Sequence, residues 1–279
     1  MSEKSPMQAA VAVAVAQFAP GADTAANLVE IERMTRLAAS RGANLVVFPE
    51  YSSFFTPTMG PDWVAAAEPL DGPFVRALAA VAADTGCHIV AGLVETGSEA
   101  TASAHGRVRN TVVALAPNSG LVARYRKLHL YDAFGMRESD WVEAGDITEP
   151  ELFELGGLRV GLQTCYDVRF PEVTRRLVDA GAELVLVPAE WVRGPLKEAH
   201  WRTLCTARAL ENTVYLAAAD HAPPVGVGNS FVIDPMGVEL ATIGESTDVA
   251  LAWISRERLE SVRRLNPALE LRRFAVSAR

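Results

Sequence analysis

Two stretches of the chain decide the fold, because residues 39–50 (ASRGANLVVFPE) and residues 179–190 (DAGAELVLVPAE) repeat one pattern. Each contains the end of an expected helix, a glycine, a continuous apolar run and then a proline. Glycine suits the position after a helix. An apolar run without alternation is typical of a strand buried on both faces. Each stretch therefore predicts a helix followed by a buried strand that stops near its proline.

The repeat extends to the residues around these stretches, so that each half reads strand, helix, strand, helix, strand and hairpin. A helix between two buried strands predicts a parallel crossover. We therefore expect two sheets packed face to face with helices outside, which is an α/β four-layer α-β-β-α sandwich with an internal pseudo-two-fold repeat. The matched segments are residues 11–18 and 158–165, residues 85–94 and 212–219, and residues 110–125 and 229–243.

Composition is ordinary for a globular protein and argues against two classes of partner. The 279 residues are 49% hydrophobic, and the net charge of -8 comes from acidic and basic residues that are interleaved. Interleaving argues against a nucleic-acid partner and against an anionic membrane surface, because both require clustered Lys and Arg. No apolar run reaches the ~18–20 residues of a membrane helix. We expect one domain over residues 1–279, with a core at 9–254 and a tail at 255–279.

Cysteine and histidine usage narrows the chemistry. The three cysteines are Cys87, Cys165 and Cys205, an odd number without a C-x-x-C pair, so no disulfide framework is indicated. Free thiols fit a reducing compartment, and we expect the protein in the cytoplasm. The histidines have no metal-ligand spacing, and no phosphate-binding loop or dinucleotide fingerprint is present. We therefore expect neither a metal nor a cofactor.

Cys165 is the candidate nucleophile. It ends the expected strand 158–164, and Pro171 suits the first turn of the helix that follows. A strand-to-helix turn of this kind exposes a nucleophile and offers backbone N–H groups to an oxyanion. The alternative is a buried packing cysteine. That interpretation fits Cys87, at the start of a core strand, and Cys205, inside a helix, better.

Two charged residues are candidates for acid–base work beside this thiol. Pro49 ends a strand ladder, so Glu50 lies at the carboxyl end of a buried strand. Such a carboxylate is either a solvated loop residue or a general base. Lys127 lies among apolar and aromatic residues, and an inward-facing ammonium needs a carboxylate partner, for which Glu50 and Glu138 are candidates. His129 is a rival partner for Cys165.

Three motifs together resemble the carbon–nitrogen hydrolase (nitrilase) superfamily, over about residues 9–270. They are VFPE at 47–50, YRKLHL at 125–130 and CYDVRFPE at 165–172. The resemblance implies a catalytic triad of Glu50, Lys127 and Cys165. It places a second glutamate on Glu138, although the loop before Glu138 looks shorter than in many relatives. The run after Lys127 looks like the amidase branches, which makes an amide substrate the expectation.

The resemblance implies hydrolysis of a small linear amide to a carboxylic acid and ammonia through a thioester. An N-carbamoyl amino acid hydrolase or a nitrilase is the alternative within the family. A catalytically silent binding protein and a thiol-redox protein are the alternatives outside it. The sequence does not name the substrate. In the family the tail and the helix after the nucleophile often contact a second subunit, so a homodimer or a higher homo-oligomer is expected. A disordered or self-packed tail is the alternative.

Substrate-binding residues are expected in the loops at the strand ends. Aromatic residues there serve equally well as core or rim residues, and arginines there suit a substrate carboxylate. Arg169 is equally suited to pair with Asp167 or Glu172 and hold the turn, and Arg193 is a second candidate. The expected substrate-binding residues are Tyr51, Tyr166, Arg169 and Trp191.

Overall fold

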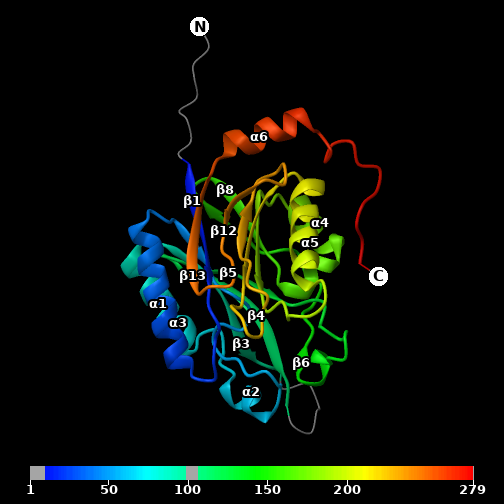
Figure 1. Cartoon of the computed structure of the whole chain (residues 1–279). Helices are drawn as coiled ribbons and strands as arrows, with labels where there is room; N and C mark the ends of the chain where they lie inside the picture. Colours follow the sequence, from blue (N-terminus) through cyan, green and yellow to red (C-terminus); the bar gives the residue numbers. More distant parts are fainter. Residues whose placement is uncertain (1–9, 99–105, 279) are drawn as a thin grey trace.

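The computed structural model describes residues 10–98 and 106–278, which form two β-sheets with helices on their outer faces (Figure 1). The first sheet has the order β13-β1-β2-β3-β4-β5, and β6 pairs with β4 outside this path. Its strands are β1 (Val11–Gln17), β2 (Leu45–Val47), β3 (His88–Thr96), β4 (Val108–Ala116), β5 (Gly120–Arg126), β6 (Val142–Glu143) and β13 (Asp248–Ile254).

The second sheet has the order β12-β11-β10-β9-β8-β7. Its inner strands β8, β9 and β10 are parallel, as β1, β2 and β3 are in the first sheet. The strands are β7 (Leu152–Leu155), β8 (Leu158–Leu162), β9 (Leu184–Ala189), β10 (Tyr215–Asp220), β11 (Phe231–Ile233) and β12 (Glu239–Thr242).

Helices cover the outer face of each sheet (Figure 1). Buried residues of α1 and α3 pack on the first sheet, and buried residues of the α4 and α5 region pack on the second. This is the predicted α-β-β-α sandwich. The helices are α1 (Thr24–Ser40), α2 (Pro61–Ala66), α3 (Pro73–Thr85), α4 (Pro171–Asp179), α5 (Lys197–Asn212) and α6 (Arg256–Leu265), with short 3-10 turns η1 (Glu138–Asp140) and η2 (Cys165–Arg169).

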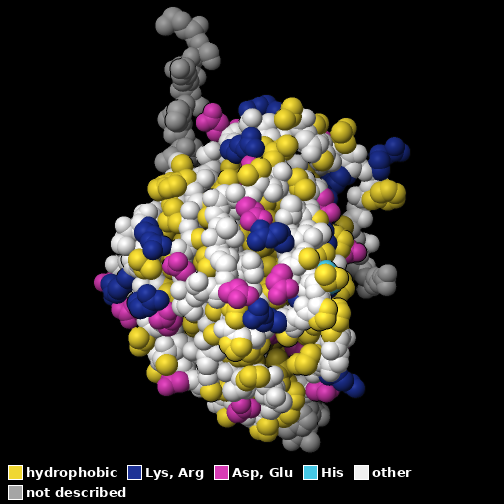
Figure 2. Space-filling view, viewed as in Figure 1, with side chains coloured by type: hydrophobic (Ala, Val, Ile, Leu, Met, Phe, Trp, Pro, Cys, Tyr) yellow, Lys and Arg dark blue, Asp and Glu magenta, His cyan; other side chains and the backbone are white. Residues whose placement is uncertain are grey.

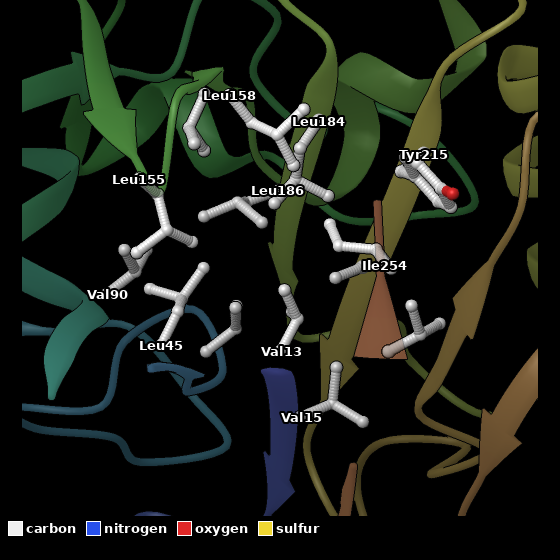
Figure 3. Close-up of a cluster of buried hydrophobic side chains, with 14 of the residues drawn as sticks. Val13, Val15, Leu45, Val90, Leu155, Leu158, Leu184, Leu186, Tyr215 and Ile254 are labelled. Atoms are coloured by element: carbon white, nitrogen blue, oxygen red, sulfur yellow. The ribbon is translucent and has the colours of Figure 1, made fainter. Parts of the chain in front are cut away.

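A central apolar layer joins the two sheets. Figure 3 shows Val13, Leu45 and Val90 of the first sheet meeting Leu184 and Leu186 of the second. All five side chains are fully buried. Burial of apolar surface stabilises by about 25 cal/mol per Å², so this layer holds the sheets face to face.

The two halves follow the same path, as the repeat predicts. Strands β1 to β5 are matched in order by β8 to β12. The chain also closes the repeat in a way that the sequence did not indicate. The last strand, β13, pairs antiparallel with β1, just as β7 pairs antiparallel with β8. The strand β13, which follows the second half in the sequence, therefore forms an edge strand of the first sheet.

The surface carries no large single-sign patch on the face shown in Figure 2, where basic and acidic side chains are interspersed. This agrees with the interleaved charges of the sequence. Among the described residues, no helix is both long and apolar enough to cross a membrane.

Replacing Leu186 with Ala should lower the free energy of unfolding by about 2–5 kcal/mol, because it leaves a cavity between the sheets. Leu186 is 0% exposed, whereas Leu240 on β12 is 42% exposed. The control Leu240→Ala should therefore change stability by no more than about 0.5 kcal/mol. Urea unfolding measures both values, and equal losses would contradict the central position of Leu186.

Candidate active site

The four residues expected to act together meet in one buried cluster, and three of them follow the ends of strands. Glu50 follows β2, Lys127 follows β5, Glu138 opens η1 and Cys165 follows β8. Their exposed fractions are 1%, 2%, 5% and 6%, respectively. The site therefore combines three residues of the first half and its loop with one residue of the second.

The ammonium group of Lys127 is held by two carboxylates. Its Nζ donates to Glu50 Oε1 at 2.9 Å and lies 2.9 Å from Glu138 Oε2. A buried ion pair is stable only where further hydrogen bonds satisfy its remaining atoms. Here two negative groups surround one positive group, which gives the cluster an excess of negative charge.

Hydrogen bonds from neighbouring elements fix both carboxylates. Asn110 Nδ2 donates to Glu50 Oε1 at 2.6 Å and to Glu138 Oε1 at 3.1 Å. Tyr51 OH donates to Glu138 Oε1 at 2.5 Å, and the Tyr131 N–H donates to Glu138 Oε2 at 2.5 Å. Glu138 thus has four donors when Lys127 is included, so its position is tightly determined.

The backbone is strained on both sides of the site. Cys165 has φ 43° and Tyr51 has φ 54°, values in the left-handed region that non-glycine residues rarely adopt. Such residues cost of order 1–3 kcal/mol and cluster at active sites. Gly92 permits the turn at Tyr51, because a Cβ there would lie 2.2 Å from Tyr51 N. The left-handed Cys165 bears out the sharp turn expected from the sequence.

The Cys165 thiol is protonated in this environment. Burial and the neighbouring Glu50 carboxylate raise its pKa well above the usual value, and Lys127 only partly opposes them. Its Sγ lies 3.4 Å from the carbonyl oxygen of Glu190, which accepts the thiol hydrogen bond. Attack by this sulfur therefore requires a base, and the neighbouring carboxylate that acts on its pKa is Glu50.

Lys127 and Glu138 both keep their charges. Burial lowers the pKa of Lys127, but Glu138 and Glu50 outweigh it and hold this pKa well above its usual range. Burial raises the pKa of Glu138. Lys127 and the hydrogen bond from Tyr51 lower it by more than burial raises it, so this pKa lies below its usual value. Lys127 and Glu138 therefore form a permanently charged ion pair.

A cavity of about 410 Å³ opens onto the cluster. Of the expected substrate-binding residues, Tyr51, Tyr166 and Trp191 line it, and Tyr51 also positions Glu138. Arg169 stacks on Trp191, with its guanidinium carbon 4.7 Å from the ring centre, and its Nε is buried without a hydrogen-bond partner. It pairs with neither Asp167 nor Glu172 among the described residues.

Other candidates from the sequence lie elsewhere. His129 Nδ1 is 2.7 Å from Asp167 Oδ1, its ring stacks on Phe170, and it lines a different cavity. Arg193 forms an ion pair with Glu245 at 2.5 Å. Cys87 and Cys205 are buried in apolar clusters. His129 therefore has a partner other than the thiol, and the two remaining cysteines pack in the core.

Three residues of the site were not predicted from the sequence. Asn110 lies near the start of β4 and gave no signal beyond its counterpart Asn229. Lys197 begins α5, lines the cavity and donates from Nζ to Tyr131 OH at 2.8 Å. Glu190 was visible only as the counterpart of Glu50, yet its N–H donates to Glu50 Oε2 at 2.7 Å. The pseudo-two-fold repeat was the signal that could have found Glu190.

Comparison with known proteins identifies the class of this fold and site. Residues 12–264 match the family described as carbon-nitrogen hydrolase. The chain belongs to the carbon–nitrogen hydrolase family, in its amidase-like branch.

Individual relatives agree with this assignment. A deaminated glutathione amidase of Escherichia coli O157:H7 is 49% identical over 173 residues, which cover 62% of this chain and 65% of that protein. A deaminated glutathione amidase of Synechocystis is 35% identical over 259 residues, covering 89% of this chain and 93% of that protein.

A solved structure of the Nesterenkonia sp. AN1 amidase superposes with a TM-score of 0.74. It is 26% identical and covers 93% of this chain and 96% of that chain. In it the acetamide moiety of fluoroacetamide is covalently attached to the active-site cysteine. The present protein is an enzyme of this class, a carbon–nitrogen hydrolase that acts on non-peptide bonds.

Replacing Glu190 with Gln should raise the melting temperature, and the gain should grow between pH 4.5 and pH 7.5. Burial, Glu50 and Asp220 raise the pKa of Glu190 well above its usual value, with Lys127 opposing them and Glu138 adding to them. Above the unfolded pKa of about 4.3, the native state keeps a proton that the unfolded chain has lost, so stability falls as pH rises. A glutamine side chain does not titrate, so the variant lacks this fall of stability with pH.

Calorimetry or circular dichroism across that pH range measures the gap between the two proteins. The control Glu154→Gln changes an exposed residue of β7 and should give a gap that stays small at every pH. A Glu190→Gln gap that stays constant or shrinks as pH rises would contradict the raised pKa.

Proposed function

We propose that the protein hydrolyses a small linear amide to a carboxylic acid and ammonia through a thioester on Cys165. The observation that carries the proposal is the Lys127 ammonium held by Glu50 and Glu138 beside a buried thiol. Acyl transfer requires a nucleophile, a base near it and a fixed positive charge, and this cluster contains all three kinds of group.

In the acylation step, Glu50 accepts the thiol proton and Cys165 attacks the amide carbonyl carbon. Lys127 and the backbone N–H of Tyr166 stabilise the oxyanion, and such a donor is typically worth ~3–4 kcal/mol. Glu50 returns the proton to the amide nitrogen, the carbon–nitrogen bond breaks and ammonia leaves. The acyl group remains bound to sulfur as a thioester.

In the second step, Glu50 accepts a proton from water, and the hydroxide attacks the thioester carbon. The carbon–sulfur bond breaks, Cys165 regains its proton from Glu50 and the acid leaves. Glu138 keeps its charge throughout, since Lys127, Tyr51 and Tyr131 all donate to it. Its proposed role is to orient Lys127 rather than to transfer protons.

Two cations at or near the cavity favour an amide that carries a carboxylate. Lys197 and Arg169 lie near the aromatic residues of the wall, and neither forms an ion pair with a carboxylate of the described residues. A substrate carboxylate would supply the missing charge, whether Arg169 contacts it directly or through a shift of its side chain. The two relatives named deaminated glutathione amidase support an amide substrate.

The other activities of the family are outcomes that product analysis separates. An N-carbamoyl amino acid hydrolase would release carbon dioxide with ammonia, and a nitrilase would consume a nitrile. A binding protein without activity would leave every amide intact. The buried thiol with a neighbouring carboxylate favours an active hydrolase over a binding protein without activity.

A homodimer is part of the proposal, as is a single domain over the whole chain and a location in the cytoplasm. A cavity of about 750 Å³ lies between α4, the end of β5 and residues 276–278 of the tail. Beside it the tail exposes Leu271 and Phe274, which are 70% and 92% exposed. Large apolar side chains of this kind favour contact with a second subunit.

All three cysteines are free, which suits a reducing compartment.

Replacing Cys165 with Ala should lower ammonia release from an amide substrate by at least about 10⁴-fold, because the covalent step is lost. The control Cys87→Ala removes a thiol from the core and should retain turnover. Ammonia is measured with a coupled assay on a panel of short amides. Turnover by Cys165→Ala at the wild-type rate would refute the nucleophile assignment.

Mass spectrometry of Glu50→Gln with substrate should then find any acyl adduct on Cys165 and none on Cys205.

The double replacement of Leu271 and Phe274 with Ser should convert a dimer into a monomer, because it removes the apolar surface of the tail. Light scattering should report half the wild-type mass. The control Val238→Ser alters a residue that is 53% exposed at the turn before β12 and should leave the mass unchanged. A monomeric wild-type protein would exclude the dimer.

A further inference from the structure

Two side chains on the cavity wall contact each other and are not used in the proposed mechanism. Tyr131 lies in the loop between β5 and η1 of the first half, and Lys197 begins α5 of the second. Both line the cavity that contains Cys165. Lys197 Nζ lies 2.8 Å from Tyr131 OH, so the two halves of the chain meet at this pair.

The chemistry of the two groups fixes the direction of their hydrogen bond. An ammonium group has three N–H donors and no acceptor, so Lys197 donates and the Tyr131 oxygen accepts. Burial raises the pKa of Tyr131 to about 12, so the hydroxyl keeps its own proton near neutral pH. Among the described residues, no other hydrogen bond uses that proton or the remaining N–H groups of Lys197. The pair therefore has an O–H donor and N–H donors to offer to a ligand.

The positive charge of Lys197 has no anionic partner among the described residues. The groups whose charges act on it are Arg169, Cys165 and Glu190. Burial raises the pKa of the Cys165 thiol and of the Glu190 carboxyl group well above their usual values, so both hold a proton near neutral pH. The charge that remains is a second cation, Arg169. A buried cation is stable where an anion pairs with it, so this part of the wall favours an anionic ligand.

Aromatic rings surround the ammonium group of Lys197. Its Nζ lies 4.5 Å from the ring centre of Phe134 and 5.3 Å from that of Trp191. Burial and Arg169 lower the pKa of Lys197, and an anion beside it would oppose both effects. Arg169 also stacks on Trp191, but its Nε and Nη2 are buried and it does not line the cavity. Of these two cations, Lys197 is therefore the one that can donate to a ligand in the cavity.

We propose that Tyr131 and Lys197 are specificity-determining residues that together bind a carboxylate of the substrate. The O–H of Tyr131 donates to one carboxylate oxygen and an N–H of Lys197 to the other. A carboxylate has two acceptor oxygens and no donor, so it matches two adjacent donors with one positive charge. This inference deepens the proposed function and rests on it, but binding tests it separately.

The experiment compares the monoamides of succinic and glutaric acid with the corresponding diamides, in which a neutral amide replaces the carboxylate. We expect the wild-type protein to prefer the better monoamide over its diamide in kcat/KM by about 10-fold or more, the usual effect of hydrogen bonds to a charged group. Lys197→Met should bring this ratio close to one. Tyr131→Phe removes only the hydroxyl and should lower the ratio by about 3-fold or more. Lys197→Arg keeps the charge and should retain most of the preference.

Arg137→Met is the matched control, because it also removes a cation from the lining of this cavity. Arg137 differs from Lys197 in that it has an anionic partner, Asp140, at 3.5 Å. The control should therefore retain the wild-type ratio. A loss as large as that of Lys197→Met would show that the overall charge of the cavity sets the preference, and it would overturn the inference.

Calorimetry on Cys165→Ala measures binding of the same ligands without turnover. The better monoamide should bind more tightly than its diamide, and adding Lys197→Met should remove the difference. If no amide is hydrolysed but this binding difference depends on Lys197, the proposed function fails and the inference stands. If no monoamide is preferred over its diamide in either measurement, or if Lys197→Met or Tyr131→Phe keeps the full preference, the inference is overturned.

Discussion

The burial of the Lys127 ammonium between two carboxylates is the interaction on which the rest of the site depends. Glu50 and Glu138 come from separate elements, and each approaches Nζ to 2.9 Å. Losing one partner of a buried ion pair leaves an uncompensated charge and typically costs about 3–5 kcal/mol. The loops after β2 and β5 and the turn η1 must therefore adopt these positions together. Asn110 contacts both carboxylates and so connects the loop after β2 with the turn η1.

The doubled architecture explains why the site lies where it does. Two sheets packed face to face bring the ends of β2 and β9 together, so that Glu50 and its counterpart Glu190 touch. The two glutamates then differ through their surroundings. Glu50 is paired with Lys127, whereas Glu190 has a pKa raised by burial and by Glu50 itself. One repeated position therefore gives the proposed base in one half and a carboxyl group with a raised pKa in the other.

The site is unfavourable for stability in several respects, and the apolar layers compensate for it. Cys165 and Tyr51 have left-handed backbone conformations. Buried acidic groups with raised pKa values, Glu190 and Asp220, destabilise the native state near neutral pH. Apolar clusters between the sheets and under the helices supply the opposing free energy. Conflicts of this kind between local preference and fold are expected at functional sites.

The sequence by itself determined the layered fold and most of the candidate site. Apolar runs before Pro49 and Pro188 marked the buried strands, and their repetition predicted the stacked halves, because strand burial and helix punctuation are local properties. The same local signals placed Glu50 and Cys165 at strand ends. The apolar surroundings of Lys127 made it a candidate with Glu138 as a possible partner, and the family motifs supplied their expected roles.

Only the tertiary structure decided the pairing of β13 with β1 and the contacts of Asn110, Glu190 and Lys197. Residues 77 positions apart, such as Glu50 and Lys127, meet through packing rather than through any periodicity. Whether a polar side chain is paired or left with a free oxygen depends on neighbours from distant strands. That information does not exist in any single stretch of the chain.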